Sequence, residues 1–264
     1  MVSTTRNLAA KRQVLWTLVQ RDLRVRYARS WLGYVWTVLD PLAMSFIYFV
    51  VFVFVFKRGD VGHQPYFLFL VIGLLAWQWF NATVIDTARA LLAEAKLLRS
   101  TNLPREIWVV RVVIAKSIEY LLSLPVLLGF TLVYALLGDV HFGWGILLFP
   151  LGVALEFVLL TGVGLFLAPV TALVTDMQRL VRIMLRMTFY MTPILYAVNR
   201  VPEPFDKVMW LNPLTGVLEL MRAGFFDAAI RWPAVGSSVV MTLVVLFLGL
   251  RTFRRLERAV LKEI

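Results

Sequence analysis

The sequence predicts an all-α integral membrane protein with six transmembrane helices. Of its 264 residues, 60% are hydrophobic and only 16% are charged, which is not the balance of a soluble domain of this size. The mean hydropathy is +0.79. Apolar stretches recur at the length of roughly 20 residues that a helix needs to cross about 30 Å of hydrocarbon. These observations place most of the chain in a membrane.

Six stretches are long and apolar enough to be predicted as spans. They are residues 35–56, 66–88, 109–137, 144–174, 181–198 and 234–250. The fourth is long enough to tilt or to break at Pro150 or Pro169, and the last two are short, so counts of five and seven stay open. The chain then divides into a cytoplasmic segment at 1–34, a transmembrane domain at 35–250 and a basic tail at 251–264.

The 27 Lys and Arg residues are divided unevenly between the two sides of the predicted membrane. Most of those outside the spans lie before the first span, after the second and after the last. The opposite connections hold few, Arg222 among them. Because Lys and Arg accumulate in short cytoplasmic loops, both termini are predicted to be cytoplasmic. The net charge of +11 is spread over separate segments, which disfavours binding of nucleic acid.

Two amphipathic helices are predicted on the cytoplasmic side. In the first, before residue 35, Leu15, Val19 and Leu23 recur at helical spacing, as expected for a helix in the membrane interface, and its arginines serve at least to anchor topology. The second covers residues 88–102, and Pro104 ends it. Its predicted outward face consists of the charged residues Arg89, Glu94, Lys96 and Arg99. By pattern alone, this segment is an interfacial linker.

Aromatic and polar side chains lie deep within the first two spans. The candidates for an internal surface are Tyr48, Phe52, Phe56, Trp77, Trp79 and Asn81. The first three follow at i, i+4 and i+8, and aromatic faces of this kind stack on sugar rings. Lipid contact and helix packing are the alternatives for the aromatic residues, and interhelical hydrogen bonding is the alternative for Asn81.

Five ionisable residues fall inside predicted spans, namely Asp40, Asp86, Lys116, Glu119 and Glu156. A charged Asp or Lys costs roughly 2.5 to 3.5 kcal/mol on insertion scales, so these side chains should face protein or water. Lys116 and Glu119, at i and i+3, are predicted to pair. Glu156 has no local cation, and a proton-coupled secondary transporter would use such a residue as a relay. That function stays open, although no duplicated halves are evident.

Enzymatic chemistry has no support in the sequence. There is no G-x-x-x-x-G-K-[ST] phosphate loop and no cysteine, so the usual ATP cradle, disulfides and thiolate metal sites are absent. His63 and His141 lack a constellation for catalysis or metal binding. A membrane glycosyltransferase would need clustered carboxylates, whereas those after the fifth span are scattered. The sequence therefore predicts no catalytic residue, metal or cofactor on this chain.

Three ordered blocks carry a family resemblance that extends over nearly the whole chain. They are RDLRVRYARSWLGYVWTVLDPL at 21–42, LLRSTNLPREI at 97–107, and TPILYAVNRVPE with LNPLTGVLELMR between 192 and 222. Together they resemble the permease subunits of ABC-2 type exporters, especially those that move lipid-linked O-antigen, capsular polysaccharide and teichoic acid. Drug or lipid export by a related ABC-2 permease stays open as an alternative.

The resemblance implies a homodimer in the bacterial cytoplasmic (inner) membrane with two separate ATPase subunits, which bind ATP and Mg. It implies that segment 88–102 seats in the ATPase, with the motif Pro104, Arg105 and Glu106 following it. It also implies short re-entrant helices within 199–232, on the external side. The substrate would be a lipid-linked glycan or polyol-phosphate polymer, with Glu156 and the candidate aromatic residues along its pathway. The proposed diphosphate entrance consists of Arg24, Arg26 and Arg29.

Overall fold

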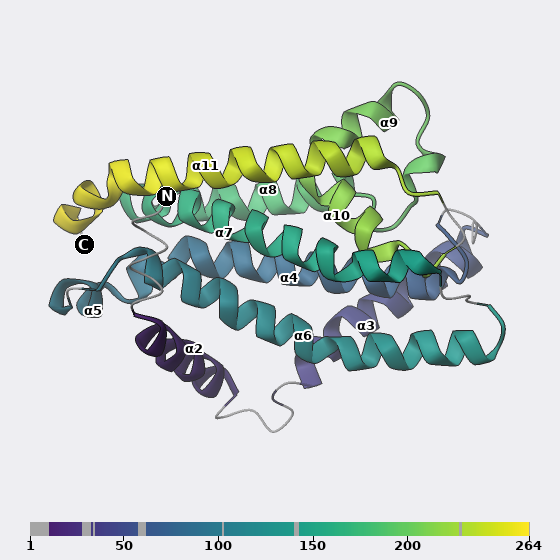
Figure 1. Cartoon of the computed structure of the whole chain (residues 1–264), viewed down its shortest axis with the longest axis horizontal. Helices are drawn as coiled ribbons and strands as arrows, with labels where there is room; N and C mark the ends of the chain where they lie inside the picture. The colour runs from purple at the N-terminus through teal and green to yellow at the C-terminus, as the bar shows by residue number, and fades with distance from the viewer. Residues whose placement is uncertain are drawn as a thin grey trace.

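The computed structural model describes residues 11–27, 33, 35–57, 62–101, 103–139, 143–226 and 229–263. Every named element within these ranges is helical. Figure 1 shows the long helices lying roughly along the longest axis of the molecule, with the short helices α5 (Ala95–Ser100) and α9 (Phe205–Val208) towards opposite ends. The prediction of an all-α fold is therefore confirmed.

Among the described residues, five helical segments are long and apolar enough to cross a membrane. They are α3 (Val35–Val50) with the π-helical turn η1 (Val51–Val55), α4 (Tyr66–Ala93), α6 (Glu106–Leu136), the 3-10 turn η2 (Trp144–Leu148) with α7 (Phe149–Leu173), and α11 (Trp232–Glu263). α4 is buried along most of its length, because α3, α6, α7 and α10 (Pro213–Arg222) all pack against it. A helix that is apolar on all sides is suited to this central position.

The sixth predicted span corresponds to α8 (Met177–Met191), which has only 15 residues. At about 1.5 Å per residue it is roughly 22 Å long, which is less than the hydrocarbon thickness of about 30 Å. Arg182 and Arg186 are exposed on one side of α8, while Val181 and Leu185 are buried on the other. The count of six spans stays a prediction, since five of the described helices meet the length and apolarity that a span requires.

α7 and α11 pack against each other more extensively than any other pair of described helices, and glycine allows a close approach. A Cβ added to Gly162 would lie 2.7 Å from the backbone of Leu246, so a larger residue would push the helices apart. α7 continues through Pro169 without a break, and α11 continues beyond residue 250 to include the predicted basic tail. The fourth span is therefore continuous through Pro169 but changes from 3-10 to α-helix at Phe149, next to Pro150, and the tail extends the last span as a helix.

Short elements fill the stretch between α8 and α11, which the sequence analysis predicts to be external, and the end of the molecule that they form is called the external end below after that prediction. They are the 3-10 turn η3 (Val198–Arg200), α9, the 3-10 turn η4 (Met209–Leu211) and α10. In α10, Leu214, Val217 and Met221 are buried, and the helix packs against α4, α7 and α11. Re-entrant helices need such protein burial wherever the backbone leaves helical geometry at membrane depth. The arrangement fits the short re-entrant helices that the resemblance implied.

A single arginine fastens this external end. Arg222 donates from Nη1 to the carbonyl oxygen of Pro193 at 2.6 Å, and from Nη2 to those of Ile194 at 2.9 Å and Phe69 at 3.2 Å. Its guanidinium carbon also lies 3.5 Å from the centroid of the Phe69 ring. Gly73 leaves room for the guanidinium, because a Cβ at that position would collide with Nη2. Arg222 thereby joins α10, α4 and the turn after α8.

The opposite end of the molecule holds α2 (Arg12–Tyr27), α5 and the C-terminal end of α11 (Figure 1). α2 packs against α6, with Val19 fully buried and Leu15 half-buried. The predicted amphipathic helix before the first span is confirmed as a helix with this inward face.

Candidate functional site: a coupling end and a transport groove

The predicted helix at 88–102 is divided in two. α4 continues to Ala93, Glu94 has φ −116° and ψ 25°, and α5 begins at Ala95. Leu91 and Leu98 are buried, which matches the predicted inward face. The predicted outward residues Arg89, Lys96 and Arg99 are exposed. Most of the predicted amphipathic face is therefore present, but on two helices that meet at Glu94.

Glu94 itself points inward, so its predicted outward position is wrong. The guanidinium of Arg111 in α6 donates from Nη2 to Glu94 Oε1 at 3.1 Å and from Nη1 to Asp22 Oδ1 at 2.8 Å. Arg21 also donates to both carboxylates, at 3.3 Å in the case of Asp22. The side chain of Arg111 is only 4% exposed, and a buried cation needs carboxylate partners. Helix α4 ends at Ala93, and the carboxylate of the next residue, Glu94, is one of the two partners of the buried Arg111 guanidinium.

These four residues, Arg21, Asp22, Glu94 and Arg111, are called the ion-pair cluster below. The cluster joins three separate elements, because Arg21 and Asp22 belong to α2, Glu94 to the α4–α5 junction and Arg111 to α6. The sequence analysis missed Asp22 and Arg111. One signal was available, since Asp22 is the only acidic residue among residues 1–34.

The motif at 104–106 also makes an internal contact. Arg105 Nη1 donates to Glu257 Oε1 of α11 at 2.8 Å. Glu106 occupies the first turn of α6, where a carboxylate interacts favourably with the helix dipole, and Pro104 precedes it, half-buried. Of the predicted coupling residues, Arg89, Lys96 and Arg99 are exposed, whereas Glu94, Pro104, Arg105 and Glu106 are half-buried.

A groove of about 440 Å³ lies between α3, α4 and α8. Four of its wall residues are aromatic, namely Tyr48, Trp77, Phe189 and Tyr190, and its polar wall residues are Asp40, Gln78, Asn81, Arg182 and Arg186. The ring of Phe189 is central, with centroids 6.1 Å from Tyr48, 5.4 Å from Trp77 and 5.1 Å from Tyr190. The groove combines an aromatic wall with two guanidinium groups at one side.

Three of the predicted pathway residues, Tyr48, Trp77 and Asn81, line this α3–α4–α8 groove. Phe52 and Phe56 do not line it, and the Phe52 ring instead lies 6.2 Å from Tyr66 and 5.9 Å from Phe56. The reason is local, because residues 51–55 form a π-helical turn, and the wider turn breaks the i, i+4 register on which the prediction depended.

The other two predicted pathway residues lie elsewhere. Trp79 stacks on Tyr120 with ring centroids 4.5 Å apart and planes 14° apart, and it lines a second cavity on the α6 side of α3. Glu156 is fully buried in α7, and neither of its carboxylate oxygens has a hydrogen-bond partner among the described residues. It lines neither cavity. The structure thus separates these two residues from the groove.

The α8 residues of the groove were missed by the sequence analysis, which treated 181–198 as an ordinary span. The spacing of Arg182 and Arg186 at i and i+4, with Phe189 following, already indicates a polar and aromatic stripe on one helix face.

The predicted ion pair of Lys116 and Glu119 is confirmed, with a nitrogen–oxygen distance of 3.0 Å, and a carboxylate oxygen of Asp86 lies 3.4 Å from the same Lys116 nitrogen.

The predicted diphosphate entrance is described only in part. Arg24 is exposed on α2, whereas Arg29 and the side chain of Arg26 lie outside the described residues. Within the described ranges, no group of three His, Asp or Glu residues is placed to hold a metal ion.

Together, the long apolar helices and the open aromatic groove define a multi-pass α-helical membrane protein with the form of a transporter subunit. Over residues 13–226 the sequence matches the family described as ABC-2 type transporter, and the chain belongs to that family. It is 29% identical to the O-antigen export system permease protein RfbA of Klebsiella pneumoniae, over 95% of each chain.

Two further relatives have similar extents. The chain is 29% identical to the O-antigen export system permease protein RfbA of Myxococcus xanthus, over 86% of this chain and 85% of the relative. It is 26% identical to the polysialic acid transport protein KpsM of Escherichia coli, over 92% and 93%. The similarity therefore extends over nearly the full length of proteins named for polysaccharide transport.

Proposed function

We propose that this chain is the transmembrane permease subunit of an ATP-driven exporter, and that its substrate is a lipid-linked polysaccharide or a related polymer. Membership of the ABC-2 type transporter family and the names of the relatives support this proposal. The α3–α4–α8 groove is the observation that carries it, since its wall suits a sugar polymer that bears phosphate.

The groove offers two kinds of contact. The faces of Tyr48, Trp77 and Phe189 can stack on the apolar C–H surfaces of sugar rings without fixed hydrogen bonds, so a polymer could slide along them. Arg182 and Arg186 can form bidentate, charge-assisted hydrogen bonds with phosphate groups. A substrate with both sugar and phosphate would use both parts of the wall.

A second copy of the chain would close the groove. The groove is open in one protomer, and the neighbouring surfaces of α3 and α8 expose large apolar side chains, including Phe46, Ile47, Ile183 and Met187. Exposed apolar faces of this kind serve as contact surfaces for lipid or protein. We assign them to a homodimer in which the two grooves face a common path.

The driving force would come from two separate ATPase subunits, which bind ATP and Mg. Arg89, Lys96 and Arg99 are exposed at the end of the molecule that holds α5, and they are the proposed contacts with the ATPase. The ion-pair cluster would then pass movement of α5 to α2 and to α6. The same end would face the cytoplasm of a bacterial cell, with Arg24, Arg26 and Arg29 meeting the substrate diphosphate at the entrance.

The proposal is tested with the chain and its ATPase produced together. The purified chain alone should hydrolyse no ATP, whereas the complex should. An Arg182→Gln, Arg186→Gln variant should export polymer at least about tenfold less, the effect of losing roughly 1.4 kcal/mol of binding, while the ATPase still co-purifies. An Arg89→Glu, Arg99→Glu variant should lose the ATPase instead. Arg258→Gln, at an exposed position of α11, is the control.

Three results would contradict the proposal. One is ATP turnover by the pure chain, and the second is normal export by the Arg182 and Arg186 variant. The third concerns the proton-coupled alternative: if Glu156→Gln abolishes export and the ATPase is dispensable, the chain is a secondary transporter.

A labelling experiment tests the proposed orientation in the membrane. A cysteine introduced at Asp206 should react with an impermeant external reagent, and one introduced at Arg255 should not.

A further inference from the structure

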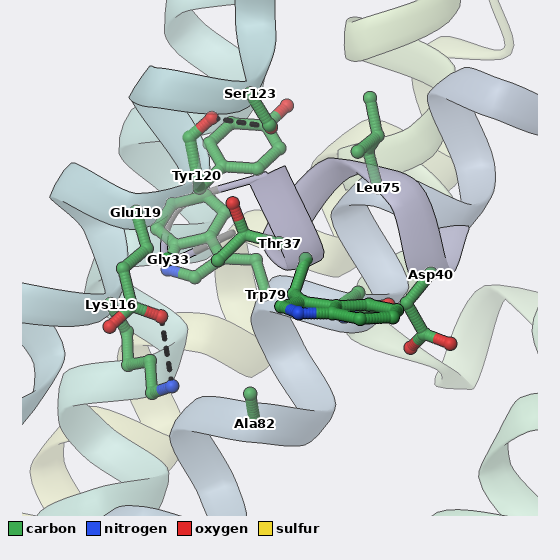
Figure 2. Close-up of a pocket in the computed structure, with 12 residues that line it drawn as sticks. Gly33, Thr37, Asp40, Leu75, Trp79, Ala82, Lys116, Glu119, Tyr120 and Ser123 are labelled. Atoms are coloured by element: carbon green, nitrogen blue, oxygen red, sulfur yellow. Dashed lines mark hydrogen bonds and ion pairs between the residues drawn. The ribbon is translucent and has the colours of Figure 1, made fainter. Parts of the chain in front are cut away.

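A second cavity, of about 500 Å³, lies between α3, α4 and α6, on the side of α3 away from α8. Its wall contains both aromatic and charged side chains, among them Trp36, Asp40, Trp79, Lys116, Glu119 and Tyr120. Figure 2 shows Lys116 and Glu119 together at one side of this cavity, joined by a dashed line, with Asp40 at the other side. This is called the α3–α4–α6 cavity below.

The length of α3 fixes the depth of this cavity in the bilayer. The apolar segment Val35–Val55 has 21 residues, which at about 1.5 Å per residue is roughly 31 Å and just matches the hydrocarbon thickness. To cross at all, the segment must therefore begin at the membrane surface. Trp36 and Asp40, which line the cavity, lie in its first two turns. The cavity is consequently at the level of lipid headgroups, in the leaflet where α3 begins.

The charges at the cavity have both signs. Lys116 is 6% exposed and lies 3.0 Å from Glu119 and 3.4 Å from Asp86. An ammonium group has three N–H donors, so two carboxylates leave one donor for a further acceptor. Asp40 adds an exposed carboxylate across the cavity. Among the described residues, the wall and its immediate support therefore hold one cation and three carboxylates, which favours a ligand with a positive group.

The aromatic wall adds a second, independent observation. Trp79 is 3% exposed, yet its indole Nε1 has no hydrogen-bond partner among the described residues. A buried indole N–H normally has an acceptor, and phosphate oxygen is a strong one. Trp36, which also lines the cavity, is exposed, and its ring face is of the type that attracts ammonium groups.

From these features we propose that the α3–α4–α6 cavity binds the headgroup of a membrane phospholipid that carries an ammonium as well as a phosphate, of the phosphatidylethanolamine type. The ammonium faces Asp40 and the aromatic wall, and the phosphate faces Lys116 and the indole N–H of Trp79. An anionic headgroup without an amine would meet the excess of carboxylates. This lipid site opens on the other side of α3 from the polymer groove, although Asp40 and Gln78 border both, and it does not depend on which substrate is exported.

Native mass spectrometry of the purified full chain tests the proposal directly. The chain is mixed with equal amounts of phosphatidylethanolamine and phosphatidylglycerol that have the same acyl chains. The ethanolamine lipid should be retained in preference on the order of fivefold, as expected for one favourable charge contact. An Asp40→Asn, Glu119→Gln variant should lose that preference. A Glu203→Gln, Asp206→Asn variant, which makes the same chemical changes in the external stretch, should keep it.

A second measurement uses only the unaltered chain, in case the cavity variant folds poorly. Phosphatidylethanolamine with a photoreactive group at the headgroup should form adducts with peptides that contain residues 35–40, 75–82 or 116–123. Equal retention of both lipids, preference for phosphatidylglycerol, or adducts confined to other helices would each overturn the proposal. Retained preference in the folded cavity variant would overturn it as well.

Discussion

The two ends of the molecule are held together by opposite kinds of polar contact. At the external end, Arg222 is buried and donates to three backbone carbonyl oxygens. At the opposite end, which is predicted to be cytoplasmic and is called the cytoplasmic end below, Arg111 is also buried but donates to the carboxylates of Asp22 and Glu94, which Arg21 also contacts. At the external end, one cation contacts backbone oxygen atoms. At the cytoplasmic end, four charged side chains from three elements contact one another.

This difference indicates which end can rearrange. The carbonyl groups that Arg222 contacts belong to the backbone of α4 and of the turn after α8, so they move only if that backbone moves. In the ion-pair cluster, each carboxylate has two arginine partners and each arginine has two carboxylate partners. One contact can therefore break while others persist. We expect a rigid external end and a cytoplasmic end able to change shape.

Loss of the external arginine should have the largest effect. Arg222→Ala leaves the carbonyl groups of Pro193 and Ile194 without this donor, whereas the carbonyl group of Phe69 keeps its partner within α4. Each unsatisfied group costs about 1 to 3 kcal/mol, so the chain should be destabilised by roughly 2 kcal/mol or more. Thermal unfolding in detergent measures the change. Lys207→Ala, at an exposed external position, should leave the unfolding temperature unaltered. A comparable unfolding temperature in both variants would contradict the rigid external end.

Crowding the external end should have the next largest effect. A Cβ at Gly216 of α10 would lie 2.6 Å from the carbonyl oxygen of Ala234 in α11, whereas one at Gly236 would meet nothing within 4 Å. Gly216→Ala should therefore cost about 1 to 3 kcal/mol of stability, as overpacking generally does. Gly236→Ala, in the same part of the fold, is the matched control and should be near neutral. Equal stability of the two variants would mean that α10 can shift away from α11 with little loss of stability.

At the cytoplasmic end we expect a small loss of stability and a larger loss of coupling. Glu94→Gln leaves Asp22 as a partner for Arg111, so the destabilisation should be only about 1 kcal/mol. The polymer exported per ATP hydrolysed should nevertheless fall severalfold, because α5 loses its charged link to α6. Glu263→Gln, exposed at the end of α11, is the control. An unchanged ratio would show that the ion-pair cluster is only structural.

The smallest predicted effect is a pH dependence at the external end. Burial lowers the pKa of His63, and the charges of Arg222, Arg200 and Arg231 lower it further. A histidine whose pKa is lowered on folding contributes full stability above its unfolded pKa of about 6.5, and that stability is lost as the pH falls through the folded value. His63→Gln should therefore flatten the decline in unfolding temperature below about pH 6.5. An identical decline in both proteins would contradict this assignment.

Local periodicity predicted much of this fold. An amphipathic helix before the first span, helical structure within 88–102, the inward positions of Val19 and Leu98, and the pair of Lys116 and Glu119 all follow from spacings within a few residues, although the division of 88–102 at Glu94 does not. The ion-pair cluster does not, because Arg111 lies 17 residues from Glu94 and 89 from Asp22. Such partners are found by tertiary packing, which a pattern of neighbours does not contain.

The groove was predicted only where the backbone stayed regular. Tyr48 and Trp77 lie on ordinary helix and reach the groove, whereas Phe52 and Phe56 do not, since the π-helical turn alters the register between them. Arg222 was counted only as an external charge, and its burial depends on a turn 29 residues earlier in the chain. A sequence pattern predicts a buried arginine only where a carboxylate lies at a suitable spacing. The acceptors of Arg222 are backbone carbonyl groups, which leave no such signal in the sequence.

The length of α11 has a practical consequence. Its 32 residues rise about 48 Å, roughly 18 Å more than the hydrocarbon thickness, and Arg105 braces the projecting part through Glu257. The projecting part of α11 is thus a rigid helical extension of the last span. A fluorophore on its final turn, at Lys262, would be displaced further than the span itself when the tilt of the span changes. The cysteine-free chain permits such a label after a single substitution.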